Sequence, residues 1–310
     1  MRILALQLKR IGDLVLTTPA LAALKSLPDA NITLGVHAGT AGLLPAIEHC
    51  DSAIVFGGGW TPWQQTLTGR FDVVLDFTGT DRSALAAFAA RARRRITFEW
   101  VRRKRLRALA HNEFVESSVR ERHTADHYLD LLQPLGIEGA SAEPVLRSPG
   151  KAAPQDYAVL HPGTARAEKN WLAERWGDVA RHLSERHGLK VVVTSGPDPS
   201  ERAHALQIQP AIHTPADLCA FAALLARARI VVSCDTAAVH LAAAFQRPQV
   251  ALFGPTNPFH WRPRHERAAV ISAAKPDAPL TSFDPRMKGA PMDGISTAVV
   301  CRAIDALLAT

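Results

Sequence analysis

Short apolar runs alternate along the chain with longer stretches in which apolar residues recur at helical spacing. In the first half, strands are predicted at residues 2–8, 31–36, 51–56, 72–76 and 95–98. Helices are predicted after a turn at residues 9–13, continuing to about residue 27, and at residues 83–93 and 123–135. Because strands that alternate with helices form a parallel sheet covered on both faces, this half predicts an α/β domain.

A stretch rich in Gly, Ala, Ser and Pro at residues 136–155 is typical of a linker. Beyond it, strands are predicted at residues 157–161, 190–195, 230–233 and 249–253. Helices are predicted at residues 173–187, from about residue 200, and at residues 217–227, 236–245 and 296–308. A chain of 310 residues suits two domains, with predicted bounds 1–150 and 151–310. Two doubly wound domains in tandem predict a ligand cleft between the carboxyl ends of their strands.

The most informative segment is residues 231–244, in which an apolar strand runs through a short polar turn into a helix of small residues. Asp235 and Thr236 are candidates to cap that helix, whose first-turn N–H groups and dipole attract anions. His240 lies one helical turn after Thr236, on the same face. The segment therefore predicts a phosphate site, although an ordinary capped helix with a core histidine fits the same pattern.

Polar residues also follow two other predicted strands of the second half. Gly163 and Thr164 offer backbone N–H groups and a hydroxyl to a phosphate, and Lys169 offers a positive charge. Glu201 is a candidate to accept hydrogen bonds from ribose hydroxyls. Because the carboxyl ends of parallel strands share one edge of a sheet, these loops together favour a nucleoside diphosphate site.

The turn after the first strand carries Gly12, which permits close backbone approach to a ligand, and Asp13. Asp13 is a candidate general base facing the cleft, and the ordinary alternative is a helix N-cap. The turn lacks the G-x-G-x-x-G fingerprint, so the sequence does not support a dinucleotide-dependent dehydrogenase.

The chain has a formal charge of +7 and a pI of about 9.6, and its basic residues are unevenly distributed along the sequence. Nine basic residues lie between positions 91 and 107, and Glu99 is the one acid among them. They are Arg91, Arg93, Arg94, Arg95, Arg102, Arg103, Lys104, Arg105 and Arg107. Such a cluster predicts an anionic partner: nucleic acid, a membrane surface or a phosphorylated substrate. Interleaved Phe98 and Trp100 favour a membrane interface, and a solvated arginine-rich surface is the alternative.

Apolar content of 47% is typical of a globular protein, and no apolar run reaches the length that crosses a bilayer. The N-terminal residues lead directly into a strand, without a secretory signal pattern. The four cysteines show neither a disulfide framework nor zinc-ligand spacing. We therefore expect a cytoplasmic protein with buried thiols and no metal.

Four motifs, in order along the chain, resemble those of the ADP-heptose:lipopolysaccharide heptosyltransferases, glycosyltransferase family nine. They are Arg10-Ile-Gly-Asp-Leu-Val-Leu-Thr-Thr-Pro19, His161-Pro-Gly-Thr with Lys169-Asn-Trp171, Ser233-Cys-Asp-Thr236 with His240, and Leu252-Phe-Gly-Pro-Thr-Asn-Pro258. The resemblance implies the GT-B architecture, two Rossmann-like domains that face each other across a cleft. It implies that the first domain binds the acceptor, that the second binds ADP-heptose, and that transfer inverts the anomeric centre without a metal or another cofactor.

The same resemblance assigns roles to individual residues. Asp13 matches the general base, Thr164 and Lys169 match diphosphate contacts, and Glu201 matches a nucleoside contact. The expected donor-site residues are Gly163, Thr164, Lys169, Glu201, Asp235, Thr236, Ala237 and His240, and the expected acceptor-site residues are Arg10, Gly12, Arg102, Arg103 and Arg105. Ala237 replaces the family's usual glycine, and its Cβ disfavours a left-handed backbone. Ala165 replaces a polar residue found in many members.

The sequence therefore predicts transfer of a heptose from ADP-heptose to a sugar hydroxyl of the lipopolysaccharide inner core. The partners would be ADP-heptose, an anionic lipid-linked oligosaccharide and the inner face of the inner membrane, without nucleic acid. One alternative is a related glycosyltransferase with another nucleotide sugar or a protein acceptor. Another is a protein that binds an anionic polymer through residues 91–107, which would leave the polar strand-end loops without a role.

Overall fold

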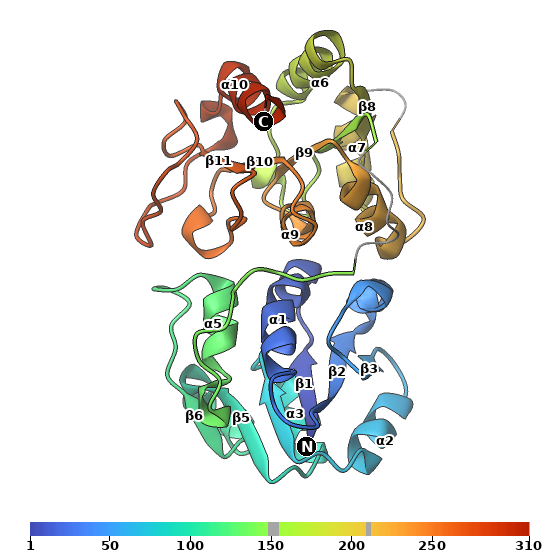
Figure 1. The fold of residues 1–310 in the computed structure, drawn as a ribbon, viewed down its shortest axis with the longest axis vertical. Coiled ribbons are helices and arrows are strands. Elements are labelled where there is room, and N and C mark those ends of the chain that lie inside the picture. Colours follow the sequence, from blue (N-terminus) through green and yellow to red (C-terminus); the bar gives the residue numbers. More distant parts are fainter. Residues whose placement is uncertain (148–154, 209–211, 310) are drawn as a thin grey trace. The chain divides into compact units, whose positions relative to one another are not determined.

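The computed structural model describes residues 1–147, 155–208 and 212–309 (Figure 1). The chain divides into two compact units, Met1–Arg147 and Ser148–Thr310. The boundary predicted at residues 150 and 151 lies outside the described residues. Each unit contains one parallel sheet, so the predicted α/β class with two doubly wound domains is confirmed. Within the described residues, no helix combines the length and the apolar composition that crossing a bilayer requires.

The sheet of the first unit has the strand order β3-β2-β1-β4-β5-β6, and every described pairing in it is parallel. Its strands are β1 (Arg2–Gln7), β2 (Asn31–His37), β3 (Ser52–Phe56), β4 (Val73–Asp76), β5 (Arg94–Phe98) and β6 (Glu113–Val115). The central strands β1 and β4 are buried almost throughout, because helices cover both faces. Their carboxyl ends lie side by side at the point where the strand order reverses, the usual place for a ligand in such sheets.

The helices of the first unit are α1 (Ile11–Leu24), η1 (Ala38–Ala46), α2 (Thr61–Thr68), α3 (Asp81–Ala89), η2 (Glu99–Arg103), α4 (Arg105–Ala108), α5 (Thr124–Asp130) and η3 (Gln133–Leu135). Helix α1 packs beside α5, and α2 packs beside α3. The apolar side chains of β1, β3 and α3 form one core cluster. Compared with the predictions, α1 begins two residues before Asp13, and the helix predicted to continue to residue 135 ends at Asp130. The elements η1, α2, η2, α4 and β6 were not predicted.

The sheet of the second unit has the order β11-β10-β9-β7-β8, also with parallel pairings. Its strands are β7 (Tyr157–His161), β8 (Lys190–Val193), β9 (Ile230–Cys234), β10 (Gln249–Phe253) and β11 (Ala268–Ser272). Its helices are η4 (Ala167–Lys169), α6 (Ala173–His187), α7 (Pro199–Ile208), α8 (Leu218–Arg227), α9 (Ala237–Ala244), η5 (Pro258–His260), η6 (Met292–Gly294) and α10 (Thr297–Leu308). Helix α6 packs against both α7 and α10, whereas α8 packs against α9.

The segment predicted as a linker is ordered in its first part. Leu146 forms an antiparallel bridge with Ile47, and the N–H group of Val145 donates to the hydroxyl of Thr18 at 2.8 Å. Residues 136–147 therefore belong to the first unit, and residues 148–154 lie outside the described part of the chain.

Candidate functional site

Three polar loops of the second unit meet at one edge of its sheet. They follow β8, β7 and β9, which are neighbours in that order. Because all three strands are parallel, their carboxyl ends face the same way, and the loops after them lie next to one another. These loops contain the predicted donor-site residues from Gly163 to Thr236, so the sheet brings together side chains that are far apart in sequence.

Lys169 and Asp235 form the central contact of this edge. The ammonium Nζ of Lys169 lies 2.6 Å from Oδ2 of Asp235, and their side chains are only 15% and 9% exposed. The prediction that Asp235 helps to cap α9 is wrong, because its carboxylate faces Lys169. Thr236 alone is the N-cap, and its hydroxyl accepts from the N–H group of Ala238 at 3.3 Å. An ammonium has three donors, so two remain for a phosphate.

Gly163 lies directly against Glu201. A Cβ at position 163 would come within 2.9 Å of Cβ of Glu201, closer than real carbon contacts allow. The loop after β7 therefore needs glycine here to approach the first turn of α7. Oε2 of Glu201 accepts from the N–H group of Gly196 at 3.1 Å, and burial raises the pKa of this carboxyl group.

The hydroxyl of Thr164 is occupied within its own loop. It donates to the carbonyl oxygen of Arg166 and accepts from the N–H group of the same residue. Thr164 is 4% exposed, whereas the neighbouring Ala165 is exposed. A phosphate contact from the Thr164 hydroxyl would therefore replace the bond to Arg166.

Ala237 and His240 belong to α9. Ala237 is the first helical residue, and it is not among the described residues with positive φ, so the expected conflict between its Cβ and a left-handed backbone does not arise. His240 is 5% exposed, and its ring meets the edge of Trp261 at a centroid distance of 6.3 Å. Trp261 also packs against the apolar cluster of α9, β10 and β11, so it is a packing residue of this unit.

His161 holds the end of β7 as a neutral group. Its Nδ1 lies 2.9 Å from Oγ1 of Thr194, and its ring packs against Phe221. Burial lowers the pKa of His161 to about 4, so the imidazole is uncharged near neutral pH.

In the first unit, Asp13 lies in the first turn of α1 and is partly exposed. It is not the N-cap; that position belongs to the exposed Arg10, whose side chain makes no capping hydrogen bond. Instead, the hydroxyl of Tyr128 on α5 donates to Oδ1 of Asp13 at 2.6 Å. Tyr128 is buried, and burial and the Asp13 charge both raise its pKa, so the hydroxyl stays protonated. The contact fixes the carboxylate and leaves Oδ2 for a ligand.

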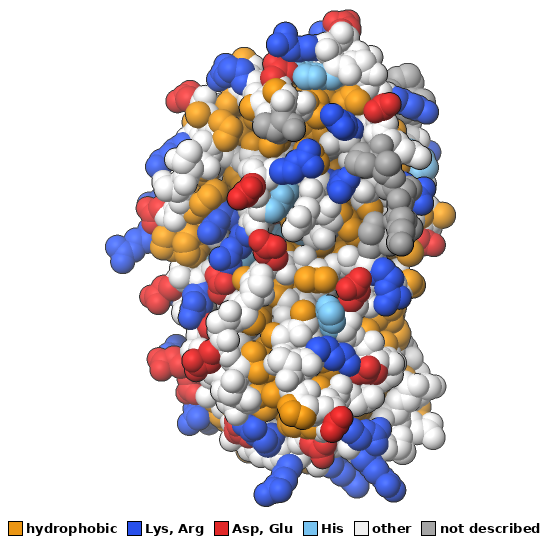
Figure 2. Space-filling model, viewed as in Figure 1, with side chains coloured by type: hydrophobic (Ala, Val, Ile, Leu, Met, Phe, Trp, Pro, Cys, Tyr) orange, Lys and Arg blue, Asp and Glu red, His pale blue; other side chains and the backbone are white. Residues whose placement is uncertain are grey.

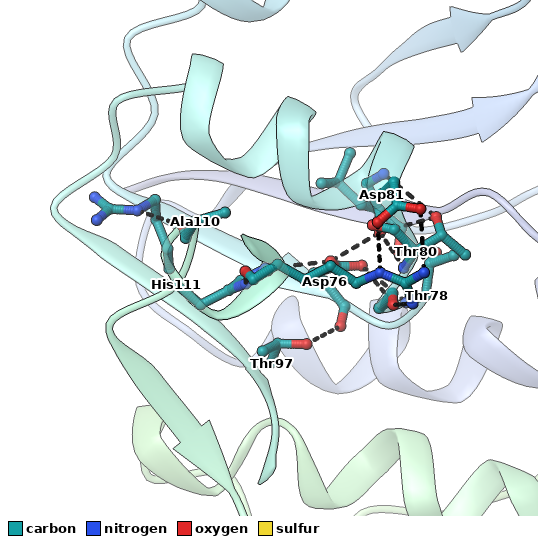
Figure 3. A network of polar contacts seen from close by, with 12 residues as sticks. Asp76, Thr78, Thr80, Asp81, Thr97, Ala110 and His111 are labelled. Carbon is teal, nitrogen blue, oxygen red and sulfur yellow. Dashed lines mark hydrogen bonds and ion pairs between the residues drawn. The ribbon is translucent and has the colours of Figure 1, made fainter. Parts of the chain in front are cut away.

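A buried polar network surrounds Asp76 at the end of β4 (Figure 3). Its Oδ1 accepts from the N–H groups of Thr78 and Gly79 at 2.9 and 3.0 Å. Its Oδ2 accepts from the Ser83 hydroxyl at 2.9 Å and faces Nε2 of His111 at 3.2 Å. Nδ1 of His111 lies 2.9 Å from the carbonyl oxygen of Arg107, so each ring nitrogen of His111 faces an oxygen atom.

This network reaches the turn that precedes Asp13. The hydroxyl of Thr78 accepts from the N–H group of Leu8 at 2.9 Å, which ties the end of β1 to the loop after β4. Asp76 and Tyr128 were not predicted as site residues from the sequence. Asp76 could have been recognised because it is an aspartate at the end of a fully buried strand. No local sequence pattern marks Tyr128.

Acidic residues from outside positions 91–107 form ion pairs with some of the basic residues in this segment. Counting only the acid within the segment, Glu99, therefore overstated its unpaired positive charge. The guanidinium of Arg94 makes two hydrogen bonds to Glu113, and that of Arg107 makes two to Asp81. Arg102 pairs with Glu99 at 3.0 Å and lies over the ring of Phe114. On the face shown in Figure 2, basic and acidic side chains are interspersed.

Arg95 is partly buried and donates to the carbonyl oxygens of Ala92 and Ala110. Five further basic residues of this segment are exposed and have no ion pair among the described residues: Arg91, Arg93, Arg103, Lys104 and Arg105. Large apolar side chains stand beside them in the same short stretch. Leu106 is 84% exposed and Leu109 is 76% exposed. Arg10 and Gly12 follow β1, whereas this segment follows β5, and β4 lies between those strands.

The profile of Glycosyltransferase family 9 (heptosyltransferase) matches residues 60–289. Lipopolysaccharide heptosyltransferase 3 of Escherichia coli is 24% identical over 286 residues, which cover 81% of this chain and 83% of that protein. A glycosyl transferase family 9 protein of Veillonella parvula superposes with a TM-score of 0.80 at 22% identity, covering 99% and 97% of the two chains. The E. coli heptosyltransferase WaaC, solved with ADP, superposes with a TM-score of 0.79 at 22% identity, covering 99% and 100%.

Proposed function

The chain belongs to glycosyltransferase family 9 (heptosyltransferase), and from this premise we propose that it transfers a heptose from ADP-heptose to a sugar hydroxyl of the lipopolysaccharide inner core. The family predicted from the motifs is confirmed, and the fold is that of the GT-B heptosyltransferases. The observation that carries the proposal is the Lys169–Asp235 pair, which lies beside the N-terminus of α9.

The second unit would hold the donor. Its loops after β7 and β9 supply an ammonium with two unused donors, and the positive end of the α9 dipole lies beside it. A diphosphate has the charge that this arrangement favours. Gly163 and Glu201 line the neighbouring loop, where a carboxylate suits the hydroxyls of a ribose. The structure of WaaC was solved with ADP, which supports this choice of nucleotide.

The first unit would hold the acceptor and the base. The acceptor oxygen attacks the anomeric carbon, its proton passes to Oδ2 of Asp13, and the bond from that carbon to the ADP oxygen breaks. Attack from the face opposite the leaving group inverts the configuration. Negative charge grows on the diphosphate as the bond breaks, so Lys169 and the α9 dipole would stabilise the transition state more than the ground state.

The direct test is an assay with purified protein and a heptose-free inner-core acceptor. We expect release of ADP from ADP-heptose and an increase in acceptor mass of one heptose, with the inverted anomer in the product. Parallel reactions contain a UDP-sugar, a GDP-sugar and a protein acceptor. Faster turnover of one of these would replace the proposal with that related transferase activity.

Lys169→Ala should weaken the binding of ADP and of ADP-heptose together. The variant loses charge-assisted hydrogen bonds to the diphosphate, which are worth about 1.5–3 kcal/mol. Isothermal titration calorimetry with ADP measures the effect. Lys190→Ala, which removes an exposed lysine at the start of β8, is the matched control. Unchanged ADP affinity in a folded Lys169→Ala protein would remove this residue from the site.

Tyr128→Phe should lower kcat and leave the affinity for ADP unchanged. The change removes the one hydroxyl that fixes Oδ1 of Asp13 and retains the ring packed against Phe77. A misoriented base transfers protons less efficiently. Tyr157→Phe is the control, because the hydroxyl of Tyr157 donates to the carbonyl oxygen of Leu224 in the second unit. Equal kcat values for the two variants would deny Tyr128 a positioning role.

We further propose that the segment from Arg102 to Leu109 docks on an anionic membrane, the surface that carries a lipid-linked acceptor. Unpaired basic side chains attract acidic headgroups, and exposed leucines insert at the boundary of the acyl chains. The exposure of Leu106 and Leu109 favours this partner over nucleic acid, whose phosphates offer no apolar surface. Arg10, Gly12, Arg102, Arg103 and Arg105 remain the proposed acceptor contacts, on the cytoplasmic side of the membrane.

Neutralising Arg102, Arg103, Lys104 and Arg105 together should weaken vesicle binding and leave ADP affinity intact. Each basic residue near an anionic surface contributes about 1 kcal/mol, and salt screens the attraction. Co-sedimentation with anionic vesicles at low and high salt measures the loss, together with acceptor kinetics at saturating donor. The control removes the same charge from exposed positions of the second unit: Lys190, Arg229, Arg286 and Lys288. Equal vesicle binding by the two variants would make the segment an ordinary solvated surface.

A further inference from the structure

Two histidines of α6 converge on one carboxylate of α10, in the second unit. Nε2 of His182 and Nε2 of His187 each lie 2.7 Å from Oδ1 of Asp305. Their rings are 5.5 Å apart, with an interplanar angle of 69°. His187 is the last residue of α6, so its side chain turns toward the same point as His182 although five positions separate them. The packing of α6 against α10 brings the carboxylate to both rings.

The three groups have the composition and the spacing of a transition-metal site. All three candidate ligand atoms lie within 4.8 Å of one another. In a tetrahedral zinc site with bonds of about 2.0–2.1 Å, neighbouring ligand atoms are about 3.3 Å apart. Each Nε2–Oδ1 distance of 2.7 Å would therefore lengthen by about 0.6 Å to admit an ion. We propose that His182, His187 and Asp305 bind a divalent first-row transition ion of the Zn²⁺ type.

The surroundings of the cluster support a ligand role for the carboxylate. Oδ1 of Asp305 faces both imidazoles, and the side chain of Asp305 is 30% exposed. Nε of Arg186 lies 3.3 Å from the other oxygen, Oδ2, and would orient the carboxylate while Oδ1 bonds the ion. Two imidazoles and one carboxylate leave one tetrahedral position for water.

The same contacts also fit a second arrangement, in which the imidazoles donate their Nε2 protons to Asp305 and no ion binds. The two arrangements differ in their protons. A metal replaces the Nε2 proton of each ligating imidazole, so its affinity rises with pH. If the three residues form only a hydrogen-bonded cluster, the protein binds no ion there at any pH.

The ion would fasten the C-terminal helix to α6. Residues on the two helices would share one centre, and a ligand that binds only the folded state stabilises it by mass action. This site lies on different residues from the loops that hold Lys169, Asp235 and Glu201, so the inference does not depend on the proposed transferase activity.

The experiment uses the full chain without an affinity tag, titrated with ZnCl₂ in a calorimeter after treatment with a chelator. We expect saturable binding of one Zn²⁺ per chain, tighter at pH 8 than at pH 6, and a Zn²⁺-dependent rise in Tm that the chelator reverses. His182→Ala, His187→Ala and Asp305→Asn should each abolish both effects. His213→Ala removes an exposed histidine elsewhere in the same unit and should leave both intact.

A spectroscopic measurement keeps the test independent of stability. Co²⁺ in the wild-type protein should show the strong visible absorption of a four-coordinate site, and His187→Gln, whose amide can still donate to Asp305, should not. Wild-type protein without saturable binding, or His182→Ala and His187→Ala variants that bind Zn²⁺ as the wild type does, would overturn the proposal and leave an ion-paired cluster.

Discussion

Asp13→Asn should lower kcat about 10²–10⁴-fold, the usual cost of removing a general base, and should leave ADP affinity and stability nearly unchanged. An amide has the shape of the carboxylate and can still accept from the hydroxyl of Tyr128, but it cannot take the proton of an attacking hydroxyl. Steady-state kinetics at saturating donor and acceptor, combined with calorimetry for ADP, separate turnover from binding.

The matched control is Asp29→Asn. It makes the same chemical change in the same unit, at a position whose φ of 51° an asparagine tolerates well. A second control combines Asp13→Asn with Tyr128→Phe. If Tyr128 acts by orienting the base, its removal should cost nothing further once Asp13 is an asparagine. Near wild-type turnover by Asp13→Asn would show that this residue serves only the first turn of α1.

Asp76→Ala should destabilise the first unit by several kcal/mol, because each buried polar group left without its partner costs about 1–3 kcal/mol. The side chains of Asp76 and His111 are both 0% exposed. Without the carboxylate, two backbone N–H groups, the Ser83 hydroxyl and one nitrogen of His111 lose their acceptor together. Urea denaturation followed by circular dichroism measures the free energy of unfolding.

Asp81→Ala provides the contrast within the same loop. Asp81 pairs with Arg107, but its side chain is 83% exposed, and ion pairs in water contribute little to stability because solvent screens them. We therefore expect a much smaller change for Asp81→Ala than for Asp76→Ala. Similar losses from the two variants would contradict the structural importance assigned to the buried network.

Helices and strands that are deeply buried were predicted more accurately than those that are partly exposed. The strands Tyr157–His161 and Gln249–Phe253 match the predictions residue for residue, because each is a fully buried apolar run between polar turns. The strand Ala268–Ser272 was missed because two alanines weaken its apolar signal. The helix Thr61–Thr68 was missed for a similar reason, since only Pro62 and Thr66 are buried in it.

The residues of the candidate site were predictable where they follow neighbouring parallel strands. They were less predictable where a contact between distant parts of the sequence positions them. Loops that follow neighbouring parallel strands meet at one edge, so the order of the motifs was enough to group Lys169 with Asp235. The contact between Tyr128 and Asp13 joins residues 115 positions apart, and no local pattern announces it. The arginine segment shows the same limit, because its acids, Asp81 and Glu113, lie outside the window in which charges were counted.

In the proposed donor site, the pairing of Lys169 with Asp235 would make this edge of the sheet selective among anions. With its counter-ion 2.6 Å away, the ammonium presents little net charge, so chloride or a single phosphate gains little by approaching it. A diphosphate offers several oxygens at once and can share the ammonium with the carboxylate. After ADP departed from such a site, Asp235 would remain in place as the internal counter-ion, and the pair would stay nearly neutral without recruiting salt from solution.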